Sequence, residues 1–187
     1  PVPTYLWGDQ GSGKTHLLKA VAQHIRQQGA EVGWMDKTTH LPDAFNPAWE
    51  VLLLDEVQQY SAIQQHMAFN WFVNAATPGA DRQPWVLSAG SLPPQDLPLR
   101  EDLRSRLGWG HVFQLHLLDD IQRKEVLLTH AQALGLHLGT DLLDYLLSRF
   151  SRDLGHLISL LEQLDHYALQ TQRPLTIPLL RAMLDET

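Results

Sequence analysis

An octet near the start of the chain combines residue types and spacing that bind phosphate. It covers residues 8–15 and reads Gly8, Asp9, Gln10, Gly11, Ser12, Gly13, Lys14 and Thr15. In such a loop the backbone N–H groups of a glycine-rich turn surround a phosphate chain at a helix N-terminus, where the aligned peptide dipoles favour anions. Lys14 is expected to reach the β- and γ-phosphates, and the Thr15 hydroxyl to ligate Mg²⁺. The octet therefore predicts a nucleotide site.

Two carboxylates end an apolar segment further along the chain, where residues 51–56 read VLLLDE. A buried strand delivers the side chains at its carboxyl end to the sheet edge where α/β proteins bind ligands. Asp55 is expected to hold Mg²⁺, directly or through water, and Glu56 to polarise an attacking water as a general base. Alone, the segment fits a structural acid that caps the next turn equally well. Together with the octet, it predicts a hydrolytic nucleotide site.

Short strand patterns alternate with helix patterns over the first part of the chain. The strand patterns lie at residues 4–7, 31–35, 51–54, 85–89 and 111–117. The clearest helix patterns lie at residues 15–28, which Gly29 ends, and at 61–76. This alternation predicts an α/β fold with a five-stranded, mostly parallel sheet.

After residue 118 only helix patterns follow. Asp119 and Gln122 have the spacing of a capping box that opens a helix, and Thr140 is a candidate cap for the next helix. Two further helices are expected at residues 152–170 and 177–184. The sequence thus predicts an α/β nucleotide-binding domain over residues 1–118 and a small all-helical lid domain over residues 119–187.

Composition narrows the class of protein. The net charge of -7 argues against a chain that grips DNA through many phosphates, so direct sequence-specific DNA binding is not expected. No apolar stretch is long enough to predict a membrane span. The absence of cysteine excludes disulfides and thiolate metal sites, and fits a reducing cytoplasm. A start at Pro1 without methionine indicates a trimmed fragment, ahead of which a docking peptide would not be visible.

These features resemble the AAA+ class of P-loop ATPases. Three sequence segments resemble the nucleotide-binding domain of the DnaA family of bacterial replication initiators: GKTHLL at 13–18, LLDEVQ at 53–58 and SRLGWG at 105–110. Within that family, YLWG at 5–8, GSLPP at 90–94 and LTIP at 175–178 look most like the Hda branch, which inactivates the initiator after replication starts. The resemblance covers essentially the whole chain. Initiators continue into a DNA-reading helix-turn-helix domain, whereas this chain stops at Thr187, which favours the shorter branch.

The resemblance implies roles for two arginines and one histidine. Arg106 falls on the family's arginine finger, which projects to the γ-phosphate of a neighbouring subunit; spacing alone leaves Arg100 and Arg104 as alternatives. Arg152 falls on the sensor-2 arginine, which would contact the nucleotide of its own chain, unless it pairs with an adjacent acid at the helix start. His16, directly after the octet, joins the nucleotide-binding set, with packing inside its helix as the alternative.

One position departs from the family pattern. After the fourth strand, where the family commonly carries a polar or acidic sensor-1 residue, the chain has Ser91. A serine can hydrogen-bond a water or a phosphate, but it carries no charge. Intrinsic hydrolysis is therefore left open by the sequence, although Glu56 is retained.

Two functions follow from the resemblance. In the first, the chain holds ADP or ATP with Mg²⁺ in its own loop, docks on ATP-bound DnaA and uses Arg106 to trigger hydrolysis there. Proteins of the Hda branch do this in the bacterial cytoplasm while an N-terminal peptide, outside this fragment, tethers them to the DNA-loaded sliding clamp. In the second, the chain is an autonomous AAA+ ATPase such as an initiator fragment, a helicase loader or a transposition helper. An arginine finger also implies contact with another subunit, so a homo-oligomer is possible.

Overall fold

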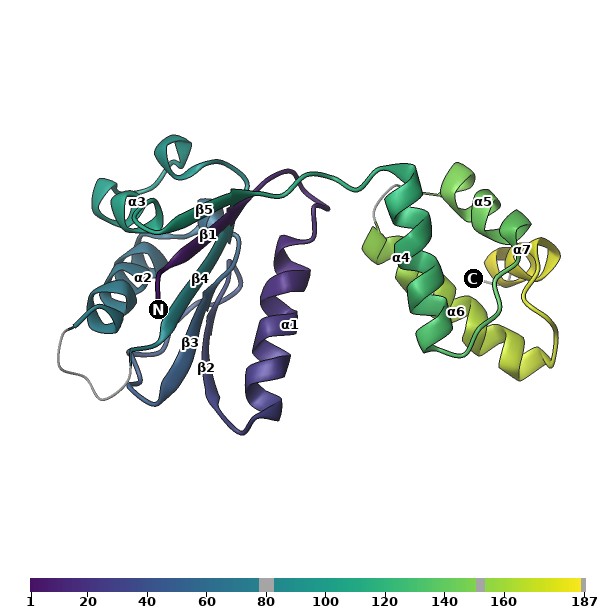
Figure 1. Ribbon diagram of the computed structural model, residues 1–187, viewed down its shortest axis with the longest axis horizontal. Helices are drawn as coiled ribbons and strands as arrows, with labels where there is room; N and C mark the ends of the chain where they lie inside the picture. The colour runs from purple at the N-terminus through teal and green to yellow at the C-terminus, as the bar shows by residue number, and fades with distance from the viewer. Residues whose placement is uncertain (78–82, 151–153, 186–187) are drawn as a thin grey trace. The chain divides into compact units, whose positions relative to one another are not determined.

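The computed structural model describes residues 1–77, 83–150 and 154–185. The chain divides into two compact units, Pro1–Leu117 and Leu118–Thr187. We call the first the α/β unit and the second the helical unit, and describe each by itself (Figure 1). In the described part of the chain, no helix has both the length and the apolar character that crossing a membrane requires.

The α/β unit is built on a five-stranded sheet in which every pair of neighbouring strands is parallel. The strand order is β2-β3-β4-β1-β5, so β1 lies inside the sheet and β2 and β5 form its edges. This confirms the predicted five-stranded parallel sheet. The strands are β1 Thr4–Trp7, β2 Glu31–Met35, β3 Trp49–Leu54, β4 Trp85–Gly90 and β5 His111–Gln114.

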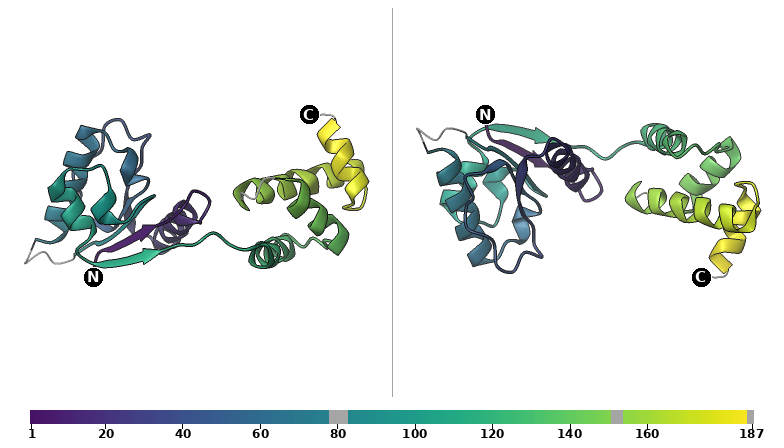
Figure 2. Two further views of the ribbon diagram at one scale, coloured as in Figure 1. Left: turned by 90° about the horizontal axis from the view of Figure 1, so that it is seen from above. Right: turned by 90° about the horizontal axis from the view of Figure 1, so that it is seen from below.

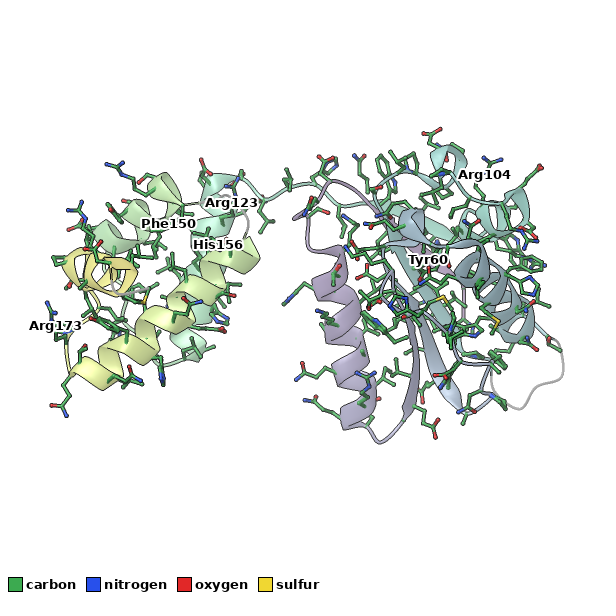
Figure 3. The ribbon with its side chains drawn as sticks, turned by 180° about the vertical axis from the view of Figure 1, so that it is seen from behind. Tyr60, Arg104, Arg123, Phe150, His156 and Arg173 are labelled. Carbon is green, nitrogen blue, oxygen red and sulfur yellow. The ribbon has the colours of Figure 1, made fainter. Side chains whose placement is uncertain are left out.

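Helices cover both faces of the sheet (Figure 2). On one face α1, Lys14–Gln27, buries Leu18 and Ala22 against β1, β3 and β4. On the other face α2, Ala62–Ala75, and α3, Glu101–Leu107, pack over a larger core. Tyr60 is buried in that core, where its hydroxyl donates to a β2 carbonyl oxygen at 2.8 Å (Figure 3). Two short 3₁₀ turns complete the unit, η1 Val57–Gln59 and η2 Pro94–Asp96.

The fifth strand is shorter than the sequence pattern predicted. The expected strand covered residues 111–117, but β5 ends at Gln114. Its neighbour β1 ends at Trp7, and the Leu115 N–H still donates to the Trp7 carbonyl oxygen at 2.7 Å. Because β5 is an edge strand, no partner continues the ladder beyond that bond.

The helical unit contains α4 Asp120–Ala133, α5 Thr140–Arg149, α6 Leu154–Thr171 and α7 Ile177–Asp185 around a leucine-rich core. The predicted capping box is present: the Gln122 N–H donates to Asp119 Oδ1 at 2.8 Å, and the Asp119 N–H donates to Gln122 Oε1 at 3.0 Å. The expectation that Thr140 caps α5 was wrong. Thr140 is the first helical residue, and extended Gly139 occupies the cap position without a side chain to accept a bond.

Candidate functional site

The octet forms the turn between β1 and α1, and its glycines adopt backbone angles that other residues rarely take. Gly11 and Gly13 have φ angles of 83° and 91°, and Gly13 is the N-cap of α1. A Cβ at Gly8 would lie 2.1 Å from the carbonyl oxygen of Leu115, so the turn can approach β5 only with glycine there. The first turn of α1 contains no acidic residue. No side-chain carboxylate therefore offsets the partial positive charge of its unpaired N–H groups, which favours an anion at the helix start.

Lys14 reaches back over the turn. Its ammonium donates to the carbonyl oxygens of Gly8 and Asp9, each at 2.7 Å, and to Ser12 Oγ at 3.1 Å. Burial lowers the pKa of Lys14, while nearby carboxylates, Asp55 first among them, act in the opposite direction. The positive charge is thus held at the mouth of the turn, where a phosphate chain would meet it.

Asp55 connects the strand-end carboxylates to the phosphate loop. It follows the last residue of β3, is only 3% exposed, and its carboxylate accepts a hydrogen bond from the Thr15 hydroxyl. Burial raises the pKa of Asp55, against the lowering effect of that bond and of the Glu56 N–H, which donates to Oδ1 at 3.0 Å. A hydroxyl and a carboxylate in contact form the all-oxygen donor set that Mg²⁺ prefers when phosphates and waters complete its shell. The residues present therefore fit Mg²⁺.

Glu56 has a strained backbone and a paired side chain. Its φ and ψ are 52° and 42°, the left-handed region that costs a residue with a side chain roughly 1–2 kcal/mol. The carboxylate accepts from the Lys37 ammonium at 2.9 Å and from Gln59 Nε2 at 3.1 Å. These contacts hold the carboxylate beside Asp55 but leave it about one-third exposed, so water can reach it.

Ser91 lies at the carboxyl ends of the strands, as the phosphate loop does. It directly follows Gly90, the last residue of β4, which is in register with Trp7 at the end of β1. The Ser91 N–H donates to Gln58 Oε1 at 3.1 Å, which ties the segment after β4 to the turn that follows Glu56. Strand ends of β1, β3 and β4 therefore bring three sequence-distant segments together.

Three arginines on or beside α3 have different surroundings. Arg100 is ion-paired with Asp102, with 2.6 Å between Nη2 and Oδ2. Arg104 lies within the helix (Figure 3). The guanidinium carbon of Arg106 lies 5.3 Å from the ring centroid of Trp109, a cation–π contact. Within the described ranges, no carboxylate forms an ion pair with Arg106.

Arg106 and the phosphate loop lie at opposite ends of the strands: Arg106 near the amino ends, and the loop at the carboxyl ends. Arg106 is near the end of α3, shortly before His111 opens β5, and His111 is in register with Thr4 at the start of β1. Gly8 follows Trp7, at the other end of that strand. At roughly 3.3 Å per residue, Thr4 and Trp7 are about 10 Å apart. Figure 1 likewise has α3 beside the start of β5, away from the loop between β1 and α1.

The structure thus separates the predicted site residues into two groups. The first group shares one edge of the sheet and comprises Gly8, Asp9, Gln10, Gly11, Ser12, Gly13, Lys14, Thr15, Asp55, Glu56 and Ser91. Asp9, Gln10 and His16 are exposed, and His16 lies within α1. Arg106 lies near the amino ends of the strands instead. Arg152 lies outside the described residues.

Sequence reasoning missed two residues of the candidate site. Lys37, which pairs with Glu56, follows β2 by two positions. Gln58, which holds Ser91, lies in η1. The sequence does place Lys37 just after a strand. That position brings it to Glu56 only because β2 is the neighbour of β3. Strand order is not encoded in the local pattern, so neither contact could be assigned from spacing.

Comparison with known proteins adds two findings. The family model described as "Hda, lid domain" matches residues 120–184, which is most of the helical unit. Domain III of the replication initiation protein DnaA from Thermotoga maritima has the same fold, with a TM-score of 0.75 and 19% identity over 98% of this chain and 83% of that one. The likeness to the initiator domain is therefore one of fold, and the sequence match to the family model is confined to the helical unit.

Two further solved structures share the fold. DnaA from Aquifex aeolicus bound to AMPPCP matches at TM-score 0.69 and 22% identity, over 88% of this chain and 55% of that one. The RuvB Holliday junction branch migration motor of Thermotoga maritima matches at TM-score 0.65 and 16% identity, over 98% of this chain and 61% of that one. The chain thus spans little more than half of the Aquifex aeolicus DnaA chain.

Proposed function

Because the chain is a Hda- and DnaA-like AAA+ protein, we propose that it regulates replication initiation by stimulating the hydrolysis of ATP bound to DnaA. In this function it binds ADP or ATP with Mg²⁺ in its own phosphate loop and supplies Arg106 to the nucleotide of the partner. The sliding clamp loaded on DNA takes part, and an N-terminal segment carries the contact with it. The protein thereby acts as a negative regulator in the bacterial cytoplasm.

The location of Arg106 is the observation that carries this proposal. It lies near the start of β5, at the opposite ends of the strands from the loop that contains Lys14, which supports a role toward another subunit's nucleotide. Its guanidinium is not neutralised by an ion pair in the part of the chain that the structure describes. An arginine finger needs such a charge, because it stabilises the negative charge that develops on the transferred phosphoryl group.

The chain's own nucleotide site has the parts for binding. Lys14 supplies a positive charge to the phosphates, and Thr15 and Asp55 supply oxygens to Mg²⁺. AMPPCP in the Aquifex aeolicus initiator supports a nucleotide in the corresponding fold. We assign Ser91 to a water or phosphate contact at this site and Arg152 to a contact with the bound nucleotide, with ADP preferred.

The test measures phosphate release from DnaA preloaded with ATP. The reactions contain DnaA alone, this protein alone, and both with clamp loaded on DNA, using the natural full-length chain. Arg106→Ala is expected to lower the stimulated rate by roughly 10³-fold, the lower end of the contribution of an arginine finger. Arg104→Ala removes the same charge two positions away on the same helix and is expected to retain stimulation. No acceleration by the wild-type protein, or acceleration that survives Arg106→Ala, contradicts the proposal.

A second candidate is an autonomous ATPase. The contact between Thr15 and Asp55 and the exposed carboxylate of Glu56 favour it, because both belong to a hydrolytic site. A high rate of phosphate release by the protein alone that Glu56→Gln abolishes would support this candidate. The regulator instead shows its main rate increase only when DnaA is present.

A further inference from the structure

Trp109 is an exposed aromatic residue of the α/β unit that lies outside its buried core. It is 65% exposed, in contrast to Trp71, which is 1% exposed in the core under α2. Its indole ring lies against the guanidinium of Arg106, 5.3 Å from the ring centroid to the guanidinium carbon. The exposed ring therefore contacts the side chain on which the proposed function depends.

The backbone beneath both side chains is fixed. Leu103 and Leu107 are buried and anchor α3 on the core, and the Trp109 N–H donates to the Arg106 carbonyl oxygen at 3.2 Å. The next residue, Gly110, runs so close to β1 that a Cβ there would lie 1.8 Å from the carbonyl oxygen of Pro3. The remaining freedom of Arg106 is thus in its own long side chain.

An indole restrains that side chain in a way that a carboxylate cannot. Fixing an arginine costs side-chain entropy, which a finger must lose at the moment it meets the phosphate. A ring in cation–π contact with the guanidinium restricts it beforehand and, unlike a carboxylate, does not neutralise its charge. Arg100 shows the alternative, because the Asp102 carboxylate accepts from its Nη2 and pairs with its charge.

We propose that Trp109 is a positioning residue that orients the guanidinium of Arg106 toward the partner's nucleotide before the two proteins dock. This inference rests on the proposed action of Arg106 in trans. Trp109 acts through Arg106 and does not itself touch phosphate.

The test measures the maximal stimulated rate and the concentration that gives half of it, for hydrolysis of DnaA-bound ATP with clamp loaded on DNA. The variants are Trp109→Leu, Trp109→Phe, Arg106→Ala and the double variant Trp109→Leu/Arg106→Ala. Trp109→Leu is expected to lower the maximal rate roughly 3- to 30-fold, the range of a cation–π contact between exposed and desolvated settings. Trp109→Phe keeps an aromatic face and should lose less. In the double variant, the change at Trp109 should have no further effect on the maximal rate.

The outcomes separate this inference from the proposed function. If Arg106→Ala retains stimulation, the proposed function fails. If Arg106→Ala abolishes stimulation while Trp109→Leu keeps the wild-type maximal rate, only the positioning role is overturned. A change confined to the half-saturating concentration would also overturn it, because Trp109 would then be a docking contact. Equal thermal unfolding of the single variants and the wild type excludes loss of folding as the cause.

Discussion

The two charged centres of the α/β unit differ in where their charges find partners. In the phosphate-loop centre, the Lys14 ammonium is held by oxygens of its own turn, Asp55 accepts from Thr15, and Glu56 is paired with Lys37. In the second centre, Arg106 contacts an aromatic ring and, within the described residues, no carboxylate. The first centre is therefore assembled from one chain, whereas the second has a positive charge that, in the proposed function, serves a group outside it.

Burial follows the same division. Asp55 is 3% exposed, and burial shifts the pKa values of both Asp55 and Lys14. Trp109 beside Arg106 is 65% exposed. Electrostatic interactions are stronger in a buried site, so the first centre suits tight retention of a charged ligand. The second is open before docking and becomes desolvated only when a partner covers it. The difference suggests a held nucleotide in one place and a transient contact in the other.

The largest effect on the phosphate-loop centre is expected from Lys14→Met. The change keeps the aliphatic stem but removes the ammonium that faces the phosphates. Hydrogen bonds to charged groups contribute about 1.5–3 kcal/mol each, so ADP affinity should fall roughly 10- to 150-fold in calorimetry. Lys19→Met, an exposed position on the same helix, is the control and should bind as the wild type does. Equal ADP affinities of the two variants would show that Lys14 does not contact the nucleotide.

Asp55→Asn should weaken the Mg²⁺-dependent part of nucleotide binding. An amide can still accept from the Glu56 N–H, but it carries no charge for the cation. We expect a loss of roughly tenfold in affinity when Mg²⁺ is present, the scale of one charged hydrogen bond. Little change is expected in EDTA. A loss of the same size in EDTA would mean that Asp55 contributes to folding of the loop and not to the metal.

The same variant gives a pH-dependent prediction. Burial raises the pKa of Asp55 above its ordinary value of 3.8, so the ionised form is less favourable in the folded chain than in the unfolded chain. The stability contribution of this carboxyl is thus fully present below the unfolded pKa and is lost as pH rises through the raised folded pKa. Asp55→Asn should therefore gain stability relative to the wild type as pH rises above the ordinary pKa of 3.8 and through the raised folded pKa. Denaturant unfolding at several pH values measures this difference, and a difference that shrinks as pH rises contradicts it.

Lys37→Met should have the smallest effect. The ion pair of Lys37 with Glu56 joins side chains that are 44% and 31% exposed, and such pairs contribute about 0.2–1 kcal/mol. The free energy of unfolding should therefore fall by less than about 1 kcal/mol. Lys124→Met breaks a comparable exposed pair with Asp144 in the helical unit and serves as the control. A much larger loss at Lys37 than at Lys124 would show that the pair holds the strained backbone of Glu56 in place.

The sequence predicted the elements well where local signals are strong. β1 and β2 have the predicted bounds, and the box of Asp119 and Gln122 opens α4 as expected. The glycine-rich octet lies in the strand-to-helix turn that its type requires. These features depend on neighbours in sequence, such as alternation along a strand or a side chain that reaches a nearby backbone N–H.

Contacts between distant segments could not be predicted in the same way. The pairing of Lys37 with Glu56 depends on which strands are neighbours. The cation–π contact of Arg106 with Trp109 depends on side-chain rotamers, and spacing left three arginines as alternatives. The end of β5 was set by the length of β1, which no local pattern in residues 111–117 reveals.

The most direct test of the division between the two centres is nucleotide binding by the isolated protein with Arg106→Ala. If Arg106 serves the nucleotide of another subunit, calorimetry should give the same ADP and ATP affinities for this variant as for the wild type, while Lys14→Met binds more weakly in the same experiment. A loss of affinity in Arg106→Ala as large as that in Lys14→Met would contradict the account, because it would assign Arg106 to the chain's own nucleotide.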